Sequence, residues 1–156
     1  MKNAKLYETH VYTRNLENAI SFYQKLDLEL AYVINERRVA FFWLGDEAIK
    51  EQMLGVWEIP AEEFRRSHFA FYVTYEELVK VPEFLAQKGI QLNPSFGLDP
   101  TEPIVHTWMP AASYYFSDLD GNSLEYVTVL DGEPKPEIGA VHLSTWRNAI
   151  NKVGNR

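Results

Sequence analysis

The chain has 156 residues, of which 46% are hydrophobic and 14% aromatic, and its formal net charge is −7. This length suits a single domain, and this much apolar material can form a buried core, which excludes a disordered chain. The negative charge disfavours nucleic acid and anionic membranes as partners, because both attract basic patches. Cysteine is absent, which excludes disulfides, thiolate catalysis, iron–sulfur clusters and zinc ribbons.

The beginning of the chain has no apolar signal region, and the longest apolar run, Val39 to Leu44, is too short to cross a bilayer. We therefore expect a soluble, cytoplasmic protein without a membrane partner.

The first half of the sequence predicts one strand, one helix and then three strands. Alternation predicts the first strand at residues 5–12, and Asn15 is a suitable N-cap for a helix that reaches Lys25. The three following strands are expected at residues 28–33, 38–44 and 52–59. Pro60 and the charged residues after it form a linker at 60–66.

The second half predicts the same order of elements. A strand at 68–74 is followed by a helical stretch from Tyr75 to Lys88, in which Pro82 either kinks the helix or begins a second helical piece. The remaining elements are a short strand at 90–93, a long loop at 94–109 with room for irregular strand, and a hairpin of strands 112–116 and 124–130 closed by Asp120 and Gly121.

The composition changes after Asp131. Residues 132–136 contain glycine and two prolines and cannot continue a sheet, whereas residues 144–150 predict a short helix. We expect this tail to pack over its own sheet or over that of a partner, with His142 on the surface.

Each half opens with a histidine in a strand, and the second half closes with a carboxylate. His10 shares a strand face with Glu8 and Tyr12, His68 begins the second half, and Glu125 follows the hairpin turn. Two imidazoles and a carboxylate can bind a divalent ion and leave open positions for catalysis. Each of the three is alternatively an ordinary strand or surface residue, and only the fold could bring them together.

Over roughly residues 4–130 the chain resembles the vicinal oxygen chelate superfamily, which contains glyoxalases, bleomycin-resistance proteins and extradiol dioxygenases. The hairpin with Asp118, Asp120 and Gly121 is the most specific match, although the family commonly has proline at the position of Leu119. The matching stretches are Thr9-His10-Val11-Tyr12-Thr13-Arg14-Asn15-Leu16, Ala19-Ile20-Ser21-Phe22-Tyr23, Ser67-His68-Phe69-Ala70-Phe71 and Tyr115-Phe116-Ser117-Asp118-Leu119-Asp120-Gly121-Asn122-Ser123-Leu124-Glu125.

The resemblance implies an α+β fold of two βαβββ modules, whose curled mixed sheets surround a shared metal-binding cavity. It implies one domain at 1–131, made of modules 4–59 and 66–131, with a C-terminal extension at 132–156. It also implies that one divalent ion (zinc, nickel, manganese or iron) is bound by His10, His68 and Glu125.

Branches of the superfamily differ in their further site residues. Glyoxalase-like members place a glutamate ligand on the last strand of the first module, where the best register here puts Gly55. Glu58 would face the cavity only after a shift of register and is otherwise a strand-end residue exposed to water.

Two other branches remain open. Fosfomycin-modifying thiol transferases resemble one another in a threonine two residues after the first histidine and in a basic cluster for the phosphonate. This chain has Tyr12 at the first place and no arginines near Glu125. Extradiol dioxygenases use the same ligand set with ferrous iron and need an acid–base group, which His106 could supply, although larger members of that branch carry additional modules.

The aromatic side chains either bind a hydrophobic substrate by stacking or pack within the sheets. The candidates for substrate binding are Trp43, Trp57, Tyr72, Trp108 and Tyr115. The candidates for proton transfer are Tyr12, His106 and Glu58.

The leading hypothesis is a metal-dependent enzyme that acts on a small oxygen-bearing substrate, with lyase, isomerase or thiol-transferase chemistry and in some cases a thiol cosubstrate. The alternatives are a ferrous ring-cleaving dioxygenase and a metal-free binding protein of the bleomycin-resistance kind. We expect a homodimer.

Overall fold

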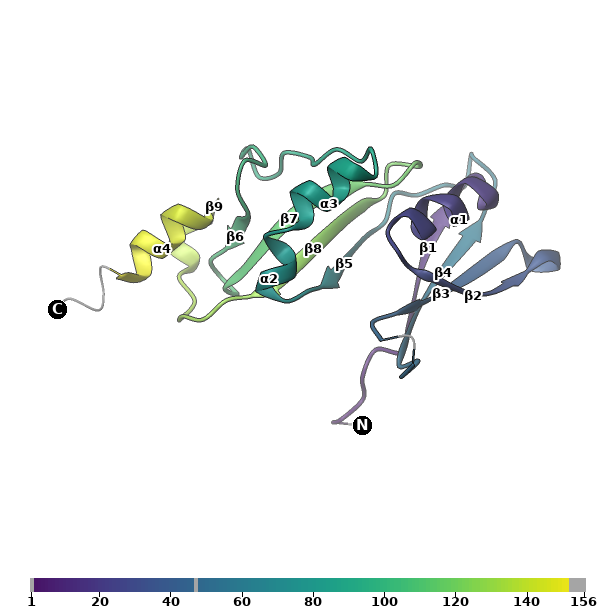
Figure 1. Ribbon diagram of the computed structural model, residues 1–156, viewed down its shortest axis with the longest axis horizontal. Coiled ribbons are helices and arrows are strands. Elements are labelled where there is room, and N and C mark those ends of the chain that lie inside the picture. Colours follow the sequence, from purple (N-terminus) through teal and green to yellow (C-terminus); the bar gives the residue numbers. More distant parts are fainter. Residues whose placement is uncertain (1, 47, 152–156) are drawn as a thin grey trace. The chain divides into compact units, whose positions relative to one another are not determined.

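The computed structural model describes residues 2–46 and 48–151, which form two mixed sheets with helices packed on them (Figure 1). The chain separates into two compact units. Unit 1 contains the residues up to Ser67 together with the loop Asp118–Asn122, and unit 2 contains the remainder. An α+β fold with two sheets is therefore confirmed.

Unit 1 has a four-stranded sheet in the order β1-β4-β3-β2, in which β1 and β4 are parallel. The pairings β4 with β3 and β3 with β2 are antiparallel. Its elements are β1 (Glu8–Thr13), α1 (Leu16–Lys25), β2 (Glu29–Ile34), the 3-10 turn η1 (Asn35–Arg37), β3 (Val39–Leu44) and β4 (Gln52–Glu58). The predicted order of strand, helix and three strands is confirmed, although β1 begins three residues later than expected.

Helix α1 begins where the sequence predicts. The side chain of Asn15 accepts a hydrogen bond of 2.8 Å from the amide of Asn18, which satisfies one of the free amides of the first turn. Its buried side chains include Phe22 and Tyr23, and the Tyr23 ring lies 5.6 Å from that of Phe42 on β3. Helix α1 therefore covers one face of the sheet and leaves the opposite face, which carries His10, without a helix.

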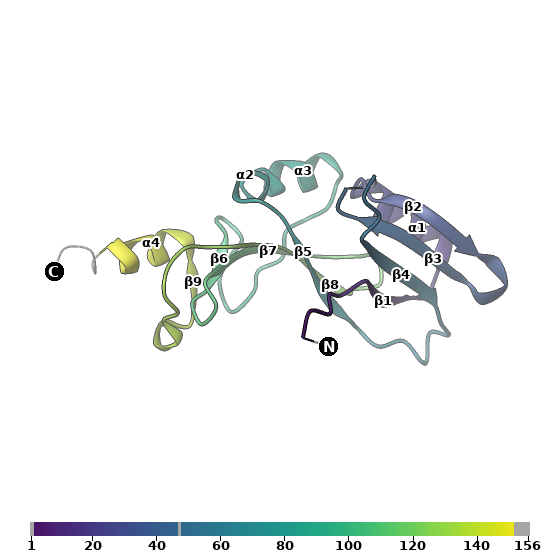
Figure 2. The same ribbon diagram turned by 90° about the horizontal axis from the view of Figure 1, so that it is seen from below.

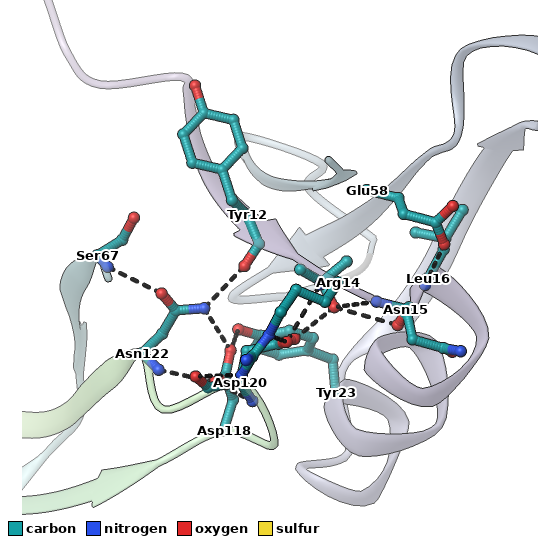
Figure 3. A network of polar contacts seen from close by, with 11 residues as sticks. Tyr12, Arg14, Asn15, Leu16, Tyr23, Glu58, Ser67, Asp118, Asp120 and Asn122 are labelled. Carbon is teal, nitrogen blue, oxygen red and sulfur yellow. Dashed lines mark hydrogen bonds and ion pairs between the residues drawn. The ribbon is translucent and has the colours of Figure 1, made fainter. Parts of the chain in front are cut away.

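The loop Asp118–Asn122 completes unit 1 (Figure 3). Buried Asn122 donates from Nδ2 to the Tyr12 carbonyl at 2.8 Å and accepts from the Ser67 amide at 2.8 Å. Asp118 accepts from the Tyr23 hydroxyl at 3.0 Å, and Asp120 pairs with Arg14 at 2.8 Å. Burial raises the pKa of Tyr23, and the nearby Asp118 carboxylate raises it further, so this phenol stays a donor.

Unit 2 has a five-stranded sheet in the order β5-β8-β7-β6-β9. The first four positions of this order match those of unit 1, with a parallel pair β5 and β8, so the predicted repeat is confirmed. Its elements are β5 (His68–Tyr72), α2 (Tyr75–Leu78), α3 (Val81–Gln87), β6 (Ile104–His106), β7 (Ala111–Ser117), β8 (Ser123–Val129), the 3-10 turn η2 (Pro136–Ile138), β9 (Ala140–His142) and α4 (Leu143–Asn151).

Two helices cover one side of this sheet (Figure 2). Helix α2 begins with a capping box in which Thr74 and Glu77 satisfy each other's backbone amides. Pro82 lies in the first turn of α3, where its missing amide hydrogen costs nothing. Of the two predicted alternatives, the structure therefore has a second helix rather than a kink.

The strand expected at residues 90–93 is not present. In that segment Asn93 forms only an isolated bridge with Tyr115, and the sheet position is filled by β6, which lies inside the predicted loop. Strand β6 is stabilised because it pairs with β7 on one side and with β9 on the other. Pairing with β7, the next strand along the chain, and with the later strand β9 thus decided which short apolar segment became the strand.

The tail after Asp131 packs on its own sheet. Strand β9 pairs with β6, and the side chain of Trp146 on α4 is buried with 1% exposure. The expected helix is confirmed, but the edge strand β9 was missed because its three residues are too short to show a period. His142 lies on β9, half-buried, and its Nε2 is 3.0 Å from the Asp99 carbonyl oxygen. Within residues 2–46 and 48–151, no helix has both the length and the apolar character needed to cross a membrane.

Candidate active site

Two of the three expected metal ligands meet in unit 2. His68 on β5 and Glu125 on β8 lie on the face opposite α2 and α3, and His68 Nε2 is 3.3 Å from Glu125 Oε2. The other ring nitrogen of His68, Nδ1, donates to the Ser123 carbonyl at 3.0 Å. When the ring carries its single proton on Nδ1, the lone pair of Nε2 is directed at the Glu125 carboxylate.

This pair suits a shared cation. Ligand atoms about 2.0–2.2 Å from a metal, at the angles of tetrahedral or octahedral sites, lie about 3.0–3.5 Å apart. The observed separation of 3.3 Å falls in this range. A histidine whose second nitrogen is fixed by a backbone carbonyl is also the usual state of a metal ligand. The donor types and their spacing in unit 2 therefore fit a divalent ion.

Buried polar groups surround Glu125. The Ser113 hydroxyl on β7 donates to its Oε1, and His106 Nε2 lies 3.8 Å from the same oxygen. Burial acts to raise the pKa of Glu125, but His106 and Ser113 together outweigh burial and leave this pKa below its ordinary value. Glu125 is thus held as a carboxylate, the form that binds a cation.

His106 forms the inner wall of this site. Its side chain is 5% exposed, and Nε2 lies 2.5 Å from the Tyr115 hydroxyl. Its Nδ1 is buried and has no hydrogen-bond partner among the described residues. Burial raises the pKa of Tyr115, and the Glu125 carboxylate raises it further, so Tyr115 is a protonated donor.

Aromatic rings enclose His106. Phe96 and Trp108 lie with their centroids 5.0 Å and 4.7 Å from the imidazole. Tyr115 and Trp108 therefore join His106 in one cluster, whereas Tyr72 lies on the same face as His68 but is 71% exposed.

The third expected ligand, His10, lies in unit 1 on the face of the sheet opposite α1. Its Nε2 is 2.6 Å from Glu8 Oε1, and its ring packs against those of Phe41 and Trp57 at 6.3 and 5.7 Å. Gly55, which the sequence places at the position of the family's glutamate ligand, is the register partner of His10 on β4. A Cβ at Gly55 would lie 2.5 Å from His10 Cδ2, so no side chain fits there beside this ring.

Glu58 does not fit the role of catalytic base. It pairs in register with Thr13, which is buried on the α1 side of the sheet. Its carboxylate accepts from the Leu16 amide at 2.7 Å and pairs with Arg38 at 2.7 Å. Hydrogen bonds from Arg38 and then from Leu16 hold the pKa of Glu58 below its ordinary value, so it joins α1 to the sheet and is a poor proton acceptor.

The remaining candidates also lie in unit 1. Tyr12 is 41% exposed on the strand face that carries His10. Trp43 and Trp57 lie on the same face, and each carries a cation over its ring: Lys50 at 5.7 Å and Arg37 at 4.6 Å. Across the parts of the chain that the structure describes, no group of three or more His, Asp or Glu side chains is arranged to hold a metal.

The sequence reasoning missed three side chains of these clusters. Ser113 lies two residues before Tyr115 on β7, so strand alternation alone would have placed it on the same face. Glu8 was placed on the face of His10 but was given no role. Phe96 carried no signal, because it lies in a loop with a positive φ of 54°.

No known family profile and no curated protein matches this sequence. Solved structures do match. An integron cassette protein from the mobile metagenome of the Halifax Harbour sewage outfall has a TM-score of 0.69 and 28% identity, over 80% of this chain and 98% of that chain. Lactoylglutathione lyase from Agrobacterium tumefaciens has a TM-score of 0.62 and 22% identity, over 82% and 96%.

A third similar structure is the fosfomycin resistance protein of Listeria monocytogenes, determined with Mn(II) and sulfate. Its TM-score is 0.58 and its identity 19%, over 83% of this chain and 93% of that chain. The neighbours thus span several chemistries while they share one architecture. The chain has the fold of the vicinal oxygen chelate superfamily, in agreement with the resemblance of its sequence motifs.

Proposed function

We propose that this protein is a divalent-metal-dependent enzyme and that its reaction is the oxygenative ring cleavage of an aromatic diol. In this proposal His10, His68 and Glu125 bind one ferrous ion. The observation that carries it is the buried pair of His106 and Tyr115 beside Glu125, because it places a proton acceptor and a proton donor next to a ligand.

The ligand types favour this chemistry. Two histidines and one carboxylate with open positions are typical of non-haem iron oxygenases. Ferrous iron held by these residues would relay electrons from the diol to dioxygen, so the reaction would need no further reductant. The neighbour from Listeria was determined with Mn(II), a divalent ion that carboxylate ligands suit.

Proton transfer is assigned to His106 and Tyr115. A diol would have to lose a proton to become a metal ligand, and the imidazole of His106 beside Glu125 would accept it. Tyr115, whose pKa is raised by burial, remains protonated and can donate a hydrogen bond to a substrate oxygen. Phe96 and Trp108, packed on His106 and themselves partly exposed, favour an aromatic substrate.

The structure offers less support for the other two reactions. Glyoxalase-type isomerisation needs a base on β4, where Gly55 has no side chain and Glu58 is bound by Arg38. Transfer of a thiol to a phosphonate needs a basic cluster near Glu125. The neighbouring Tyr126 and Thr128 are uncharged and buried on the side of the sheet that faces the helices.

The experiment is to load the purified protein with ferrous iron, nickel, zinc or manganese and to assay each form. The substrates are a catechol in air, methylglyoxal with a thiol, and an epoxide with a thiol. We expect oxygen uptake and ring cleavage only with the catechol and only with ferrous iron. Thioester formation with nickel or zinc would instead indicate glyoxalase chemistry, and no reaction together with a tightly bound ligand would indicate a sequestering protein.

Two variants separate the roles of the residues. His68→Ala should abolish uptake of about one divalent ion per chain, measured by elemental analysis after dialysis, while circular dichroism stays unchanged. His106→Gln should keep the metal content but lower the rate of cleavage by about 10²–10⁴-fold, the usual range for a lost acid–base group. Full metal uptake by His68→Ala would contradict the ligand set.

A further inference from the structure

The two sheets differ at one edge. Strand β2 in unit 1 and strand β6 in unit 2 both occupy the fourth position of the repeated strand order. Among the described residues no strand covers the outer edge of β2, whereas β9 from the C-terminal extension pairs with every residue of β6. Strand β2 contains no histidine, and β6 ends with His106. The extra strand thus lies beside the one that carries the inner wall of the candidate active site.

Immediately after β6, the extension binds a buried threonine. The Thr107 hydroxyl lies 2.7 Å from the carbonyl oxygens of both Lys135 and Gly139. The Lys135 amide in turn donates to the Thr107 carbonyl at 2.7 Å. Thr107 is therefore tied to the extension by its side chain and by its backbone, one residue from His106.

The extension is also attached ahead of β6. The Pro103 carbonyl accepts from the Leu143 amide at 2.9 Å. The Glu102 carboxylate accepts from the amide and the hydroxyl of Ser144, both at 2.8 Å, at the start of α4. Because β6 has only three residues, its ladder with β7 is short, and the extension supplies the pairing on its other edge.

We propose that the C-terminal extension is a positioning element for His106 and that Thr107 is the residue through which it acts. The Nδ1 atom of His106 has no hydrogen-bond partner among the described residues, so the imidazole is anchored only on the side of Tyr115 and Glu125. Its place therefore depends on the backbone of β6, which the extension fixes. A displacement of about 1 Å can lower a rate by roughly 10²-fold. The catalytic consequence rests on the proposed function, whereas the placement of His106 does not.

The first test is Thr107→Val, which keeps the shape of the side chain and removes its hydroxyl, in the full-length ferrous protein. We expect kcat for catechol cleavage to fall about tenfold, with KM and metal content unchanged. In the His106→Gln background the same substitution should lower kcat by less than about twofold, because a residue that acts through His106 has no effect once the imidazole is gone. Thr107→Ser, which keeps the hydroxyl, should retain the native rate.

Thr128→Val is the matched control, because Thr128 is a buried threonine of the same sheet on the face towards the helices. It should leave kcat unchanged. A second measurement does not depend on the reaction. The nuclear Overhauser cross-peak between the rings of His106 and Trp108, whose centroids lie 4.7 Å apart, should weaken in zinc-loaded Thr107→Val and persist in the control.

Hydrogen exchange of the native protein needs no variant. If β9 holds β6 in place, the amides of residues 104–107 and 139–142 should become exchangeable together. The proposal is overturned if residues 104–107 stay protected while 139–142 exchange, if Thr107→Val keeps the native cross-peak or the native kcat, or if it lowers kcat equally in both backgrounds. A weakened cross-peak in Thr107→Val, without any catechol cleavage by the native ferrous protein, would contradict the proposed reaction and leave the positioning role intact.

Discussion

At the scale of single residues, the lack of a side chain at position 55 shapes the surroundings of His10. Gly55 lies opposite His10 in the parallel ladder, and the imidazole occupies the space that a Cβ would fill. With the His10 ring in its observed conformation, a glutamate at position 55 would clash with the ring, so a carboxylate ligand cannot lie opposite His10. The glycine therefore gives His10 its place and removes the base that glyoxalase chemistry would need.

This arrangement predicts the effect of Gly55→Ala. The added methyl would lie 2.5 Å from His10 Cδ2 and 3.2 Å from Phe41 Cε1, so the imidazole must move. We expect a loss of about 1–3 kcal/mol in the free energy of unfolding, as in other overpacked sites. We also expect a roughly tenfold weaker affinity for metal, as for other displaced ligands. Urea unfolding and competitive metal titration measure the two effects.

The double variant His10→Ala/Gly55→Ala is the control. Because His10 is the nearest atom group to the new methyl, most of the destabilisation by alanine should vanish when the imidazole is absent. If Gly55→Ala lowers the free energy of unfolding equally with and without the His10 imidazole, the contact with His10 is not the cause of the loss.

At the scale of elements, Arg38 joins three segments of unit 1. It precedes β3, pairs with Glu58 at the end of β4 and pairs with Glu17 in the first turn of α1. Glu58 also accepts from the amide of Leu16, the first residue of α1. One carboxylate thus fixes the start of the helix against the ends of two strands.

This junction predicts a dependence of stability on pH. Hydrogen bonds from Arg38 and then from Leu16 hold the folded-state pKa of Glu58 below its ordinary value of 4.5. The stabilisation is therefore complete above about pH 4.5 and is lost as the pH falls through the lower folded-state pKa. Glu58→Gln should lower the urea midpoint at pH 7 and make little difference at pH 2–3. An equal deficit at both pH values would contradict the charged interaction.

The loop Asp118–Asn122 predicts a second effect at this scale. Asn122→Ala removes the partners of the Tyr12 carbonyl and the Ser67 amide, and the alanine cannot replace either hydrogen bond (Figure 3). We expect a loss of about 1–3 kcal/mol in the free energy of unfolding, the usual cost of buried groups left unsatisfied. Chemical denaturation followed by tryptophan fluorescence measures it.

Leu119→Ala in the same loop is the matched control. Leu119 is 65% exposed, so its truncation should change the free energy of unfolding by less than about 0.5 kcal/mol. Similar losses in the free energy of unfolding for both variants would show that the hydrogen bonds of Asn122 do not stabilise the fold.

At the scale of the whole molecule, we predict a homodimer. Large apolar side chains remain exposed on the strands of both units, among them Tyr32 at 67%, Tyr72 at 71% and Val129 at 71%. A second copy of the chain would cover such side chains where they form a contiguous patch. Light scattering at micromolar concentration should give twice the chain mass. A monomer mass would contradict this prediction.

The sequence by itself determined those elements whose signals are local. Asn15 caps α1, Pro82 begins α3, and alternation places His10 and Glu125 on defined strand faces. The motifs around these residues also identified the fold, because each module repeats the same strand order.

Only the tertiary structure decided features that depend on partners distant in sequence. Strand β6 formed at Ile104–His106 rather than at residues 90–93, because β9 from the C-terminal tail pairs with the edge of β6 that β7 leaves open. Glu58 became a structural residue because Arg38 and Leu16 reach it from other elements. The cluster of His106, Tyr115 and Ser113 around Glu125 depends on three adjacent strands, and no spacing along one strand encodes such a contact.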